Sequence, residues 1–233
     1  MQKKSYIIVK RVFDFTVSLI CLVVLSPLLI LVSLILLFSG EHLVFYCQER
    51  VGYKNRPFKL IKFVTMTKES GVDIGKHPTT LPGDKRVLPF GKFLRKTNIN
   101  ELPQLINILK GELSFVGPRP LSNFGWQRYS EHIRLNIYNV KPGMTGLGSV
   151  VFSDEPTLVA SYNMDPLTVY DQIIIPYKGE LEMYYQKHAS MITDFKIIFL
   201  TAWVILFPKS KLYNKFFKNL PQSVNNCLKT SVL

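Results

Sequence analysis

The sequence has few cysteines and few histidines, and each shortage excludes a class of protein. Its three cysteines, Cys21, Cys47 and Cys227, are odd in number and far apart. The chain is therefore not a small disulfide scaffold, and the usage favours a reducing compartment. The four histidines form no i,i+4 pair and no zinc-type spacing occurs, so we expect no histidine-based metal site. No internal repeat or low-complexity tract is present.

Acidic residues are also scarce. Lys and Arg number 29 against 16 Asp and Glu, giving a net charge of +13, yet 47% of the chain is apolar. An apolar fraction of this size excludes a disordered basic tail and a collagen-like chain. The length of 233 residues suits one folded domain with an accessory segment. The charge implies an acidic partner, and nucleic acid, an anionic lipid surface and a phosphorylated small molecule all satisfy it.

A long apolar run follows the basic N-terminus. Residues 15–40 contain 26 consecutive uncharged residues, mostly Leu, Ile, Val and Phe, which exceeds the roughly 18 to 20 needed for a spanning helix. The run is too long for the core of a signal peptide, and no cleavage site follows it before Glu41. We therefore expect a membrane anchor that is retained.

Ser26 and Pro27 interrupt this run near its middle. Proline removes one helical hydrogen bond, and a neighbouring serine can bond a freed carbonyl, so a bend is predicted there. Two geometries are open: a Pro-kinked spanning helix, or a re-entrant helix-break-helix that enters and leaves by one face. Basic residues lie on both sides of the run, and the positive-inside rule then favours the re-entrant form with both ends in the cytoplasm.

The rest of the chain predicts an α+β fold that is mostly helical, with a small cytoplasmic globular domain and interfacial amphipathic helices. Short strands are predicted at 42–48 and 58–63 as a hairpin, a long loop at 68–90, and a turn cluster at 141–148. Helices are predicted from near Asn100 to a stop at Gly111, at 123–137, at 181–185 and at 195–207. The predicted boundaries are 1–40 for the membrane segment, 41–208 for the cytoplasmic domain and 209–233 for a basic tail.

Cations, one carboxylate and a helix start converge in residues 91–120. Arg95 and Arg119 can clamp a pyrophosphate, and a helix N-terminus offers backbone donors to phosphate oxygens. Glu101 can hold a divalent cation that bridges those oxygens. A purely structural interpretation is also open, with Asn100 as helix cap, Glu101 as a first-turn acid and solvated arginines.

The chain resembles the bacterial sugar transferases, which are monotopic polyprenyl-phosphate phosphoglycosyl transferases. The resemblance covers nearly the whole chain in order. Its segments are KRVFD (10–14), the Ser26 and Pro27 pair, QERVG (48–52), FKLIKF (58–63), Arg86, the stretch 91–120 ending in GPRP, KPGMTG (141–146) and DFKI (194–197).

This resemblance implies an enzyme of the bacterial inner membrane whose active site faces the cytoplasm. Such an enzyme moves a sugar-1-phosphate from a UDP-sugar to undecaprenyl or another polyprenyl phosphate, with Mg²⁺ as cofactor and UMP as product. This is the first step of exopolysaccharide, capsule, O-antigen or glycoprotein glycan assembly. The residues implied are Asn100 and Glu101 for catalysis, Glu101 for the metal, and the substrate-binding set Arg95, Arg119, Lys62 and Arg86. Membrane lipid is an expected partner, nucleic acid is not, and a homo-oligomer is left open.

Position 100 departs from the family pattern. The family has an Asp-Glu pair where Asn100 and Glu101 stand here, and the Asp attacks the donor phosphate to form a covalent intermediate. Two more departures are Val64 in place of an arginine and Asp154 with Glu155 in place of a Gly-Arg-Asn turn. Three explanations are open: Glu101 is the nucleophile, the lipid phosphate attacks directly with help from Glu101 and Mg²⁺, or the chain binds without turnover. Compensation by Asp154 or Glu155 is a further hypothesis.

Two functions of other classes compete with the transferase. The first is a catalytically impaired membrane scaffold that binds nucleotide sugar or lipid phosphate, which nucleotide binding without UMP release would single out. The second is a membrane-tethered nucleic-acid binder, which accounts for the charge but lacks any recognised motif. Neither the sugar nor the glycan pathway follows from the sequence.

Overall fold

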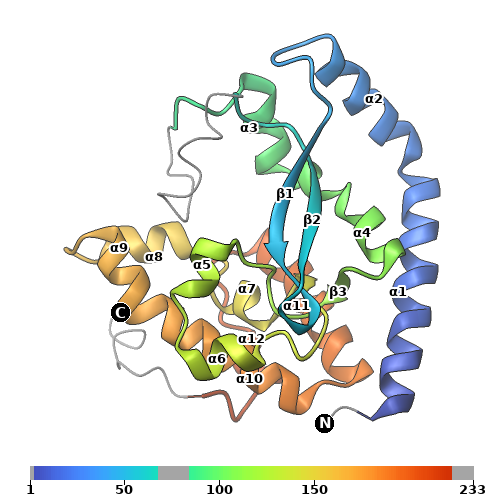
Figure 1. Ribbon diagram of the computed structural model, residues 1–233. Helices are drawn as coiled ribbons and strands as arrows, with labels where there is room; N and C mark the ends of the chain where they lie inside the picture. The colour runs from blue at the N-terminus through green and yellow to red at the C-terminus, as the bar shows by residue number, and fades with distance from the viewer. Residues whose placement is uncertain (1–2, 68–83, 222–233) are drawn as a thin grey trace.

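The computed structural model describes residues 3–67 and 84–221. As predicted, it is a mostly helical α+β chain, with two two-stranded sheets in the described part (Figure 1). Most of the predicted loop at 68–90 lies outside the described residues. The predicted end of this loop at residue 90 is wrong. Helix α3 (Pro89–Lys96) already begins at Pro89, where the fixed φ of proline suits the first turn of a helix.

The N-terminal run forms two helices that meet at a bend. Helix α1 (Lys4–Val24) and helix α2 (Ser26–Leu37) join at an angle of 62°. Pro27 lies in the first turn of α2, and the Ser26 hydroxyl donates to the carbonyl of Val23 at 2.7 Å. The predicted bend and its chemistry are confirmed. In the described ranges no single helix has the length and apolarity to cross a membrane, whereas this bent pair has them when taken together.

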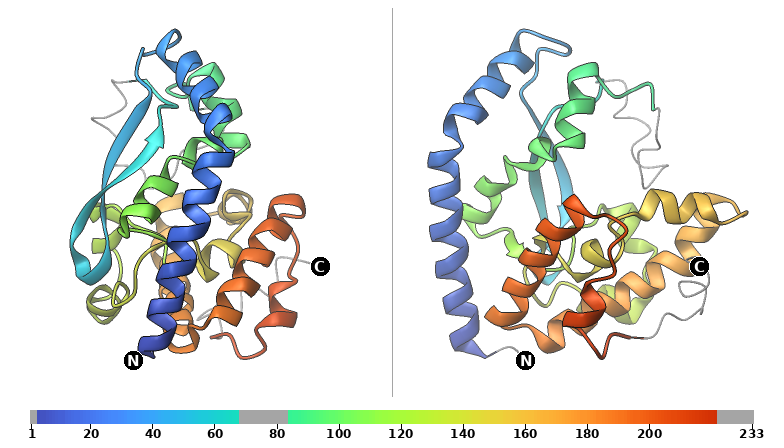
Figure 2. Two further views of the ribbon diagram at one scale, coloured as in Figure 1. Left: turned by 90° about the vertical axis from the view of Figure 1, so that its right-hand side faces the viewer. Right: turned by 180° about the vertical axis from the view of Figure 1, so that it is seen from behind.

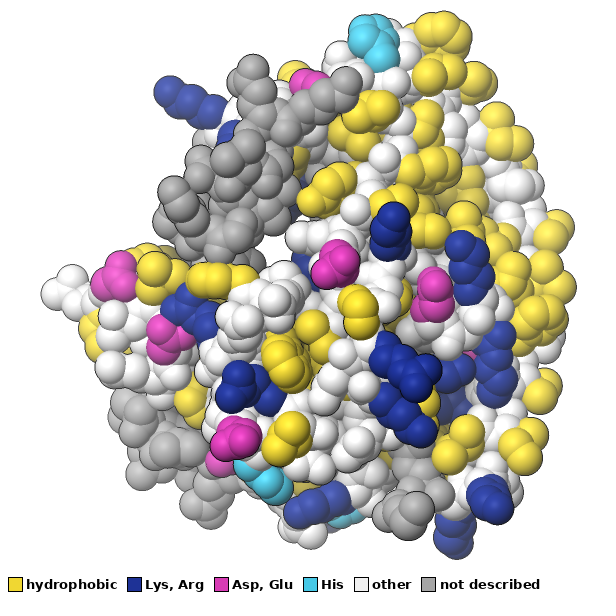
Figure 3. All heavy atoms as spheres, viewed as in Figure 1, with side chains coloured by type: hydrophobic (Ala, Val, Ile, Leu, Met, Phe, Trp, Pro, Cys, Tyr) yellow, Lys and Arg dark blue, Asp and Glu magenta, His cyan; other side chains and the backbone are white. Residues whose placement is uncertain are grey.

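One side of the bent pair exposes a continuous set of large apolar side chains. In Figure 3 this set forms the yellow right-hand edge of the molecule, along α1 and α2. The exposed residues are Ile7, Ile8, Val9, Val12, Phe15, Leu19, Ile20, Val23, Val24, Ile30, Leu31, Leu34, Ile35, Leu37 and Phe38. An exposed apolar surface of this extent is unusual for a chain surrounded by water and is typical of a lipid-facing surface.

The opposite side of α1 docks on the domain through polar groups. Asp194 of helix α11 (Met191–Leu206) is only 3% exposed and accepts bonds from Lys10 at 2.6 Å, Tyr6 at 2.9 Å and Tyr185 at 2.7 Å. Figure 2 shows α1 with the β1–β2 hairpin on one side and α11 on the other. The buried carboxylate thus ties the N-terminal helix to a segment 184 residues away.

Two further polar side chains of α1 fix the elements beside the hairpin. Arg11 donates to the carbonyls of Ile108 and Leu109, at 2.7 and 2.8 Å, at the end of helix α4 (Gln104–Lys110). A cation there complements the negative end of the helix dipole. Asp14, 2% exposed, accepts the backbone N–H of Phe115 at 3.2 Å.

The predicted hairpin is confirmed with a shifted first strand. Strand β1 (Phe45–Val51) pairs antiparallel with β2 (Pro57–Phe63), from Phe45 opposite Phe63 to Val51 opposite Pro57. The first strand starts three residues later than predicted and continues to Val51. Each of its seven residues pairs with a residue of β2, so β1 begins and ends where its partner strand does. The 3₁₀ turn Tyr53–Asn55 closes the hairpin.

A second sheet lies where turns alone were predicted. Strand β3 (Ser114–Val116) pairs in parallel with β4 (Gly143–Thr145), so the turn cluster at 141–148 is wrong in part. Glycine makes the close pairing possible: a Cβ on Gly143 would lie 2.0 Å from the backbone nitrogen of Gly117. Helix α7 (Leu147–Val151) follows directly.

The helix predicted at 123–137 is two helices, α5 (Asn123–Gln127) and α6 (Glu131–Asn136). The backbone turns extended at Ser130, with φ −56° and ψ 153°, and this separates them. The remaining helices are α8 (Glu155–Ser161), α9 (Pro166–Val169), a π turn at Tyr170–Ile174, α10 (Ile175–His188) and α12 (Tyr213–Phe216). The predicted helices at 181–185 and 195–207 are thus parts of the longer α10 and α11.

The largest core cluster lies among the C-terminal helices, α7 and the β3–β4 sheet. Fully buried members include Tyr138, Leu147, Leu181, Tyr185, Ile197 and Leu200. Two smaller clusters attach the bent pair. Val32 and Leu36 of α2 pack with Phe63 and Leu94, and the end of α1 packs near Leu60 and Ile108. The bent pair is thus part of the fold rather than an appended tail.

We expect Asp194→Ala to destabilise the chain by about 3 kcal/mol or more, because Lys10 then keeps a largely buried charge without its partner. The matched control is Asp171→Ala, which breaks the more exposed ion pair with Arg128 and should cost less than about 1 kcal/mol. Chemical unfolding in detergent measures both. Equal losses for the two variants would contradict the role given to Asp194.

Candidate active site

Glu101 is held against the hairpin by the short helix that follows it. It ends the 3₁₀ turn Ile99–Glu101, just before α4. Asn107 of α4 accepts the backbone N–H of Ile61 at 3.0 Å and donates to the carbonyl of Lys59 at 2.8 Å. This fully buried amide fixes α4 to β2. Because α4 is fixed to β2, Glu101 at the end of the 3₁₀ turn lies beside Lys62 of β2.

Glu101 lies between two cations. Its Oε1 atom accepts from Lys62 Nζ at 3.0 Å and from Arg119 Nη2 at 3.3 Å. Glu101 and Lys62 are largely buried, whereas the side chain of Arg119 is 51% exposed. Burial alone would raise the pKa of Glu101, but the charges of Arg119 and Lys62 outweigh it and lower the pKa to about 2. Burial lowers the pKa of Lys62, and Glu101 opposes that shift.

Asn100 lies next to this ion pair and is buried, at 8% exposure. Its Oδ1 atom has no hydrogen-bond partner among the described residues. A buried amide oxygen without a partner costs free energy in the folded chain. A bound ligand or metal ion at this candidate catalytic position could supply the missing partner of this oxygen atom.

The predicted helix start near Asn100 is wrong, because α4 begins at Gln104, with Pro103 as its cap residue. The backbone N–H groups of Glu101, Leu105 and Ile106 donate within tight turns, to Asn98, Leu102 and Pro103. These groups are therefore not free donors for a phosphate. The cationic side chains that contact Glu101 at this site are Lys62 and Arg119.

Arg86 and Arg95 lie in a neighbouring group around Asp84. Arg86 forms an ion pair with Asp84 at 2.7 Å, and Arg95 donates to the hydroxyl of Thr65 at 3.5 Å. Burial lowers the pKa of Arg95, while the charges of Asp84 and Glu101 oppose the shift. The four predicted substrate-binding cations thus divide into two groups. Lys62 and Arg119 contact Glu101 directly, whereas Arg86 and Arg95 interact with Asp84, and Arg95 is coupled to Glu101 only through charge.

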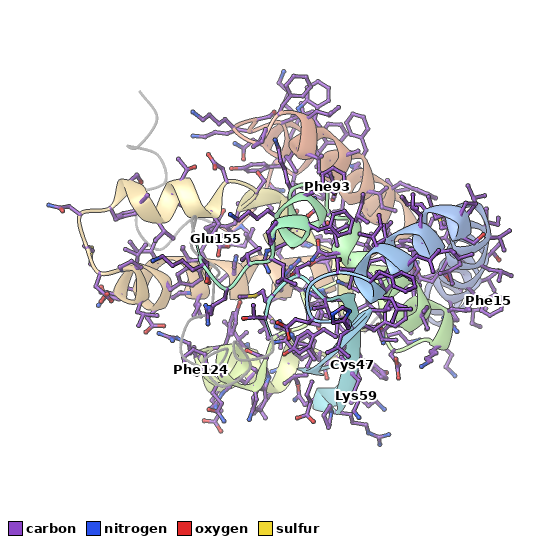
Figure 4. The ribbon with its side chains drawn as sticks, turned by 90° about the horizontal axis from the view of Figure 1, so that it is seen from above. Phe15, Cys47, Lys59, Phe93, Phe124 and Glu155 are labelled. Atoms are coloured by element: carbon purple, nitrogen blue, oxygen red, sulfur yellow. The ribbon has the colours of Figure 1, made fainter. Side chains whose placement is uncertain are left out.

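A small cavity of about 20 Å³ opens beside Lys62 and Arg119, enough for about one water molecule. Its lining also includes Arg50, which sequence reasoning treated only as part of a matching segment. The signal that was available is strand alternation. The register pairs Gln48 with Leu60 and Arg50 with Phe58, so the residues at even positions share one face. Cys47 and Lys59, labelled in Figure 4, belong to the other face.

The loop that carries Arg119 is anchored from below by buried groups. The Tyr138 hydroxyl donates to the carbonyl of Arg119 at 2.8 Å. Glu182 of α10, 4% exposed, lies close to Gly148, and its Oε2 atom has no hydrogen-bond partner among the described residues. Burial raises the pKa of Glu182 to about 8. The sequence reasoning missed Glu182, which carries no motif of its own.

Glu155, proposed above as compensation for the missing carboxylate, forms an ion pair with Lys178 of α10. Figure 4 shows it on α8, on the side of the molecule opposite Phe15 of α1. Asp154 directly precedes α8. No contact connects either carboxylate with Asn100 among the described residues, so compensation remains an untested hypothesis.

Comparison with known proteins gives matches of one kind over most of the chain. The sequence model of a family described as bacterial sugar transferase matches residues 5–208. An undecaprenyl-phosphate glucose phosphotransferase of Komagataeibacter xylinus is 35% identical over 82% of this chain. An uncharacterized sugar transferase of Bacillus subtilis is 33% identical over 85%. An Aeromonas hydrophila protein named UDP-N-acetylgalactosamine-undecaprenyl-phosphate N-acetylgalactosaminephosphotransferase is 32% identical over 86%.

These relatives differ in length. The match covers 88% of the Bacillus protein, but only 35% of the Komagataeibacter protein and 44% of the Aeromonas protein. The chain therefore spans less than half of two of the relatives whose names state an activity.

The ion pairs of Glu101 predict a pH-dependent stability. Its pKa falls from an ordinary 4.5 to about 2 in the folded chain, so its contribution is full above pH 4.5 and is lost as the pH falls towards 2. We expect Glu101→Gln to cost up to about 3 kcal/mol at pH 7, and the cost should shrink between pH 4.5 and 2. Urea unfolding at a series of pH values measures the difference.

The control for this experiment is Glu131→Gln, at an exposed position on α6. It removes one carboxylate without touching an ion pair of the site, so it should leave the stability unchanged at each pH. A cost for Glu101→Gln that stays constant down to pH 2 would show that the two cations do not stabilise its charge.

Proposed function

The chain belongs to the bacterial sugar transferase family, and we propose that it transfers a sugar-1-phosphate from a UDP-sugar to a polyprenyl phosphate, releasing UMP. One observation carries the proposal: a buried, ionised Glu101 lies between Lys62 and Arg119 beside a cavity rich in cations. Phosphoryl transfer depends on positioning and on stabilising charge at phosphate oxygens. Relatives named as undecaprenyl-phosphate sugar phosphotransferases support the choice of acceptor.

In this proposal the cations bind phosphate. Lys62 and Arg119 hold the phosphate that carries the sugar, at the cavity beside Glu101. Arg95 and Arg86, with the charge of Asp84 between them, flank the site and contribute to binding of the anionic substrates. Glu101 holds the two nearer cations in place, because it contacts both through one oxygen atom.

Mg²⁺ is the proposed cofactor. Within residues 3–67 and 84–221, no group of three or more His, Cys, Asp or Glu residues could hold a metal ion. Mg²⁺ is however often bound by one or two carboxylates together with substrate phosphates. Glu101 supplies an ionised carboxylate and Asn100 an amide oxygen without a partner, so these residues fit as its ligands. When bound, Mg²⁺ would neutralise charge on the donor phosphates.

Asn100 decides which route we propose. An amide is a poor nucleophile, and Glu101 is a weak one because its pKa lies near 2 and its Oε1 atom already accepts from two cations. We therefore favour direct displacement. An oxygen of the polyprenyl phosphate forms a bond to the sugar-bearing phosphorus, the bond from that phosphorus to UMP breaks, and UMP leaves with the bonding electron pair.

We further propose that α1 and α2 form a re-entrant anchor in the bacterial inner membrane, with the site facing the cytoplasm. Three observations support it: the 62° bend at Ser26 and Pro27, the apolar outer side of the pair, and the packing of α2 back onto the hairpin through Val32 and Leu36. A straight spanning helix would break that packing.

The function is tested by UMP release from a panel of UDP-sugars, with purified protein in detergent, polyprenyl phosphate and Mg²⁺. We expect wild type to turn over and Glu101→Gln to lose at least about a hundredfold in kcat, as for removal of a group that stabilises transition-state charge. Asn100→Asp supplies the missing nucleophile and should keep activity. It should also trap a phospho-sugar intermediate that is absent from wild type.

A silent wild type together with an active Asn100→Asp would instead identify the chain as a binding scaffold. Nucleotide-sugar binding by the silent protein would then measure what the scaffold retains. Wild-type turnover in Asp154→Asn and Glu155→Gln would reject compensation by those carboxylates.

The re-entrant anchor predicts that both ends of the bent pair lie on one side of the membrane. Single cysteines at Lys4→Cys and Glu41→Cys, in a chain without its native cysteines, should both resist a membrane-impermeant maleimide in intact spheroplasts. Both should react after permeabilisation. A spanning helix would leave one of the two reactive from outside.

A matched variant tests the cause of this topology. Pro27→Ala restores the helical hydrogen bond that proline removes, so part of the population should become spanning and expose one cysteine. Pro57→Ala, at the start of β2, serves as the control and should leave the labelling pattern unchanged.

A further inference from the structure

Arg50 is a partly buried guanidinium whose hydrogen-bond partners in the described part of the chain are all neutral. Its Nε atom donates to Gln48 Oε1 at 3.0 Å, and Nη1 donates to the carbonyl of Pro120 at 3.3 Å. Nη2 donates to the same oxygen of Gln48. In the described part of the chain no carboxylate lies within ion-pair distance of Arg50. An arginine that is partly withdrawn from water and has no anion beside it incurs a desolvation cost that a bound anion would offset.

The position of Arg50 makes this charge part of the candidate active site. Arg50 lines the small cavity together with Lys62, Gln104 and Arg119. It reaches the cavity from β1 and donates to the carbonyl of Pro120, whereas Lys62 and Arg119 both contact Glu101. Three cations therefore meet one carboxylate, and two positive charges remain uncompensated. Burial, and then the charge of Arg119, lowers the pKa of Arg50 to about 10, so it stays charged at pH 7.

We propose that Arg50 binds the phosphate group of the donor that leaves as UMP. Two uncompensated cations match the two negative charges of the diphosphate in a nucleotide sugar, and a guanidinium fixed by Gln48 is oriented to donate to phosphate oxygens. Lys62 and Arg119 contact Glu101, whereas Arg50 contacts Gln48 and Pro120 instead. We therefore assign the phosphate beside Glu101 as the reacting one and the phosphate beside Arg50 as the one that carries the nucleoside. This inference rests on the proposed function and adds the residue that receives the leaving group.

The acceptor phosphate is the other anion that an uncompensated arginine attracts. Binding of the acceptor at Arg50 would place the lipid chain beside the hairpin turn rather than beside α1 and α2, where the apolar surface lies. The geometry therefore assigns Arg50 to the nucleotide. The two sources of phosphate are separated by measuring UMP and polyprenyl phosphate in independent experiments.

The test uses Arg50→Gln and Arg50→Lys in the full chain in detergent. Binding of radiolabelled UMP is measured by equilibrium dialysis, which needs no turnover, and KM for polyprenyl phosphate is measured in the release assay. We expect Arg50→Gln to weaken UMP binding about tenfold or more, with KM for polyprenyl phosphate within about twofold of wild type. Arg50→Lys keeps the charge but loses the fork of donors, so its loss should be smaller.

The matched control is Arg56→Gln, an exposed position in the same hairpin, which should bind UMP as wild type does. Thermal unfolding of each variant identifies loss of folding. A merely structural role for Arg50 would weaken both ligands together, and that result, or unchanged UMP binding in Arg50→Gln, overturns the inference while leaving the proposed function standing. Absence of UMP binding in wild type overturns both.

Discussion

The buried carboxylate of Asp194 is the interaction on which the arrangement depends. It accepts from Lys10, Tyr6 and Tyr185, so one side of an otherwise apolar helix is held to the domain by charge and hydrogen bonds. Apolar contacts are not directional, so by themselves they would not favour one rotation of this helix against the domain over another. The hydrogen bonds and the ion pair to Asp194 do favour one rotation of α1, because they can form in that rotation only.

This constraint reaches the site through short connections. The rotation that brings Lys10 to Asp194 also places Arg11 on the end of α4, and α4 is fixed to β2 by Asn107. Glu101 stands at the start of that unit, beside Lys62. The orientation of the apolar side of α1 and the geometry around Glu101 therefore both depend on one docking surface, with few residues between them.

A structural feature could be predicted from the sequence when the residues that cause it lie next to it in the chain. The bend at Ser26 and Pro27 and the stop at Gly111 were predicted correctly, since proline, serine and glycine act on their own turns. The start of α4 was placed four residues early, because the residues from Asn100 to Pro103 satisfy a 3₁₀ turn as well as a helix. That local ambiguity is settled by tertiary contacts.

Long-range partners were out of reach for the same reason. Lys62, Glu101 and Arg119 were chosen through a resemblance, and nothing in their own segments shows that one oxygen atom joins them. Arg50 was missed as a site residue because its role requires the register of the hairpin as well as the strand itself. Arg50 and Arg119 repel each other across the cavity that both line. In the proposed role of Arg50, a bound phosphate would relieve this repulsion, so the arrangement would trade some stability of the free protein for affinity.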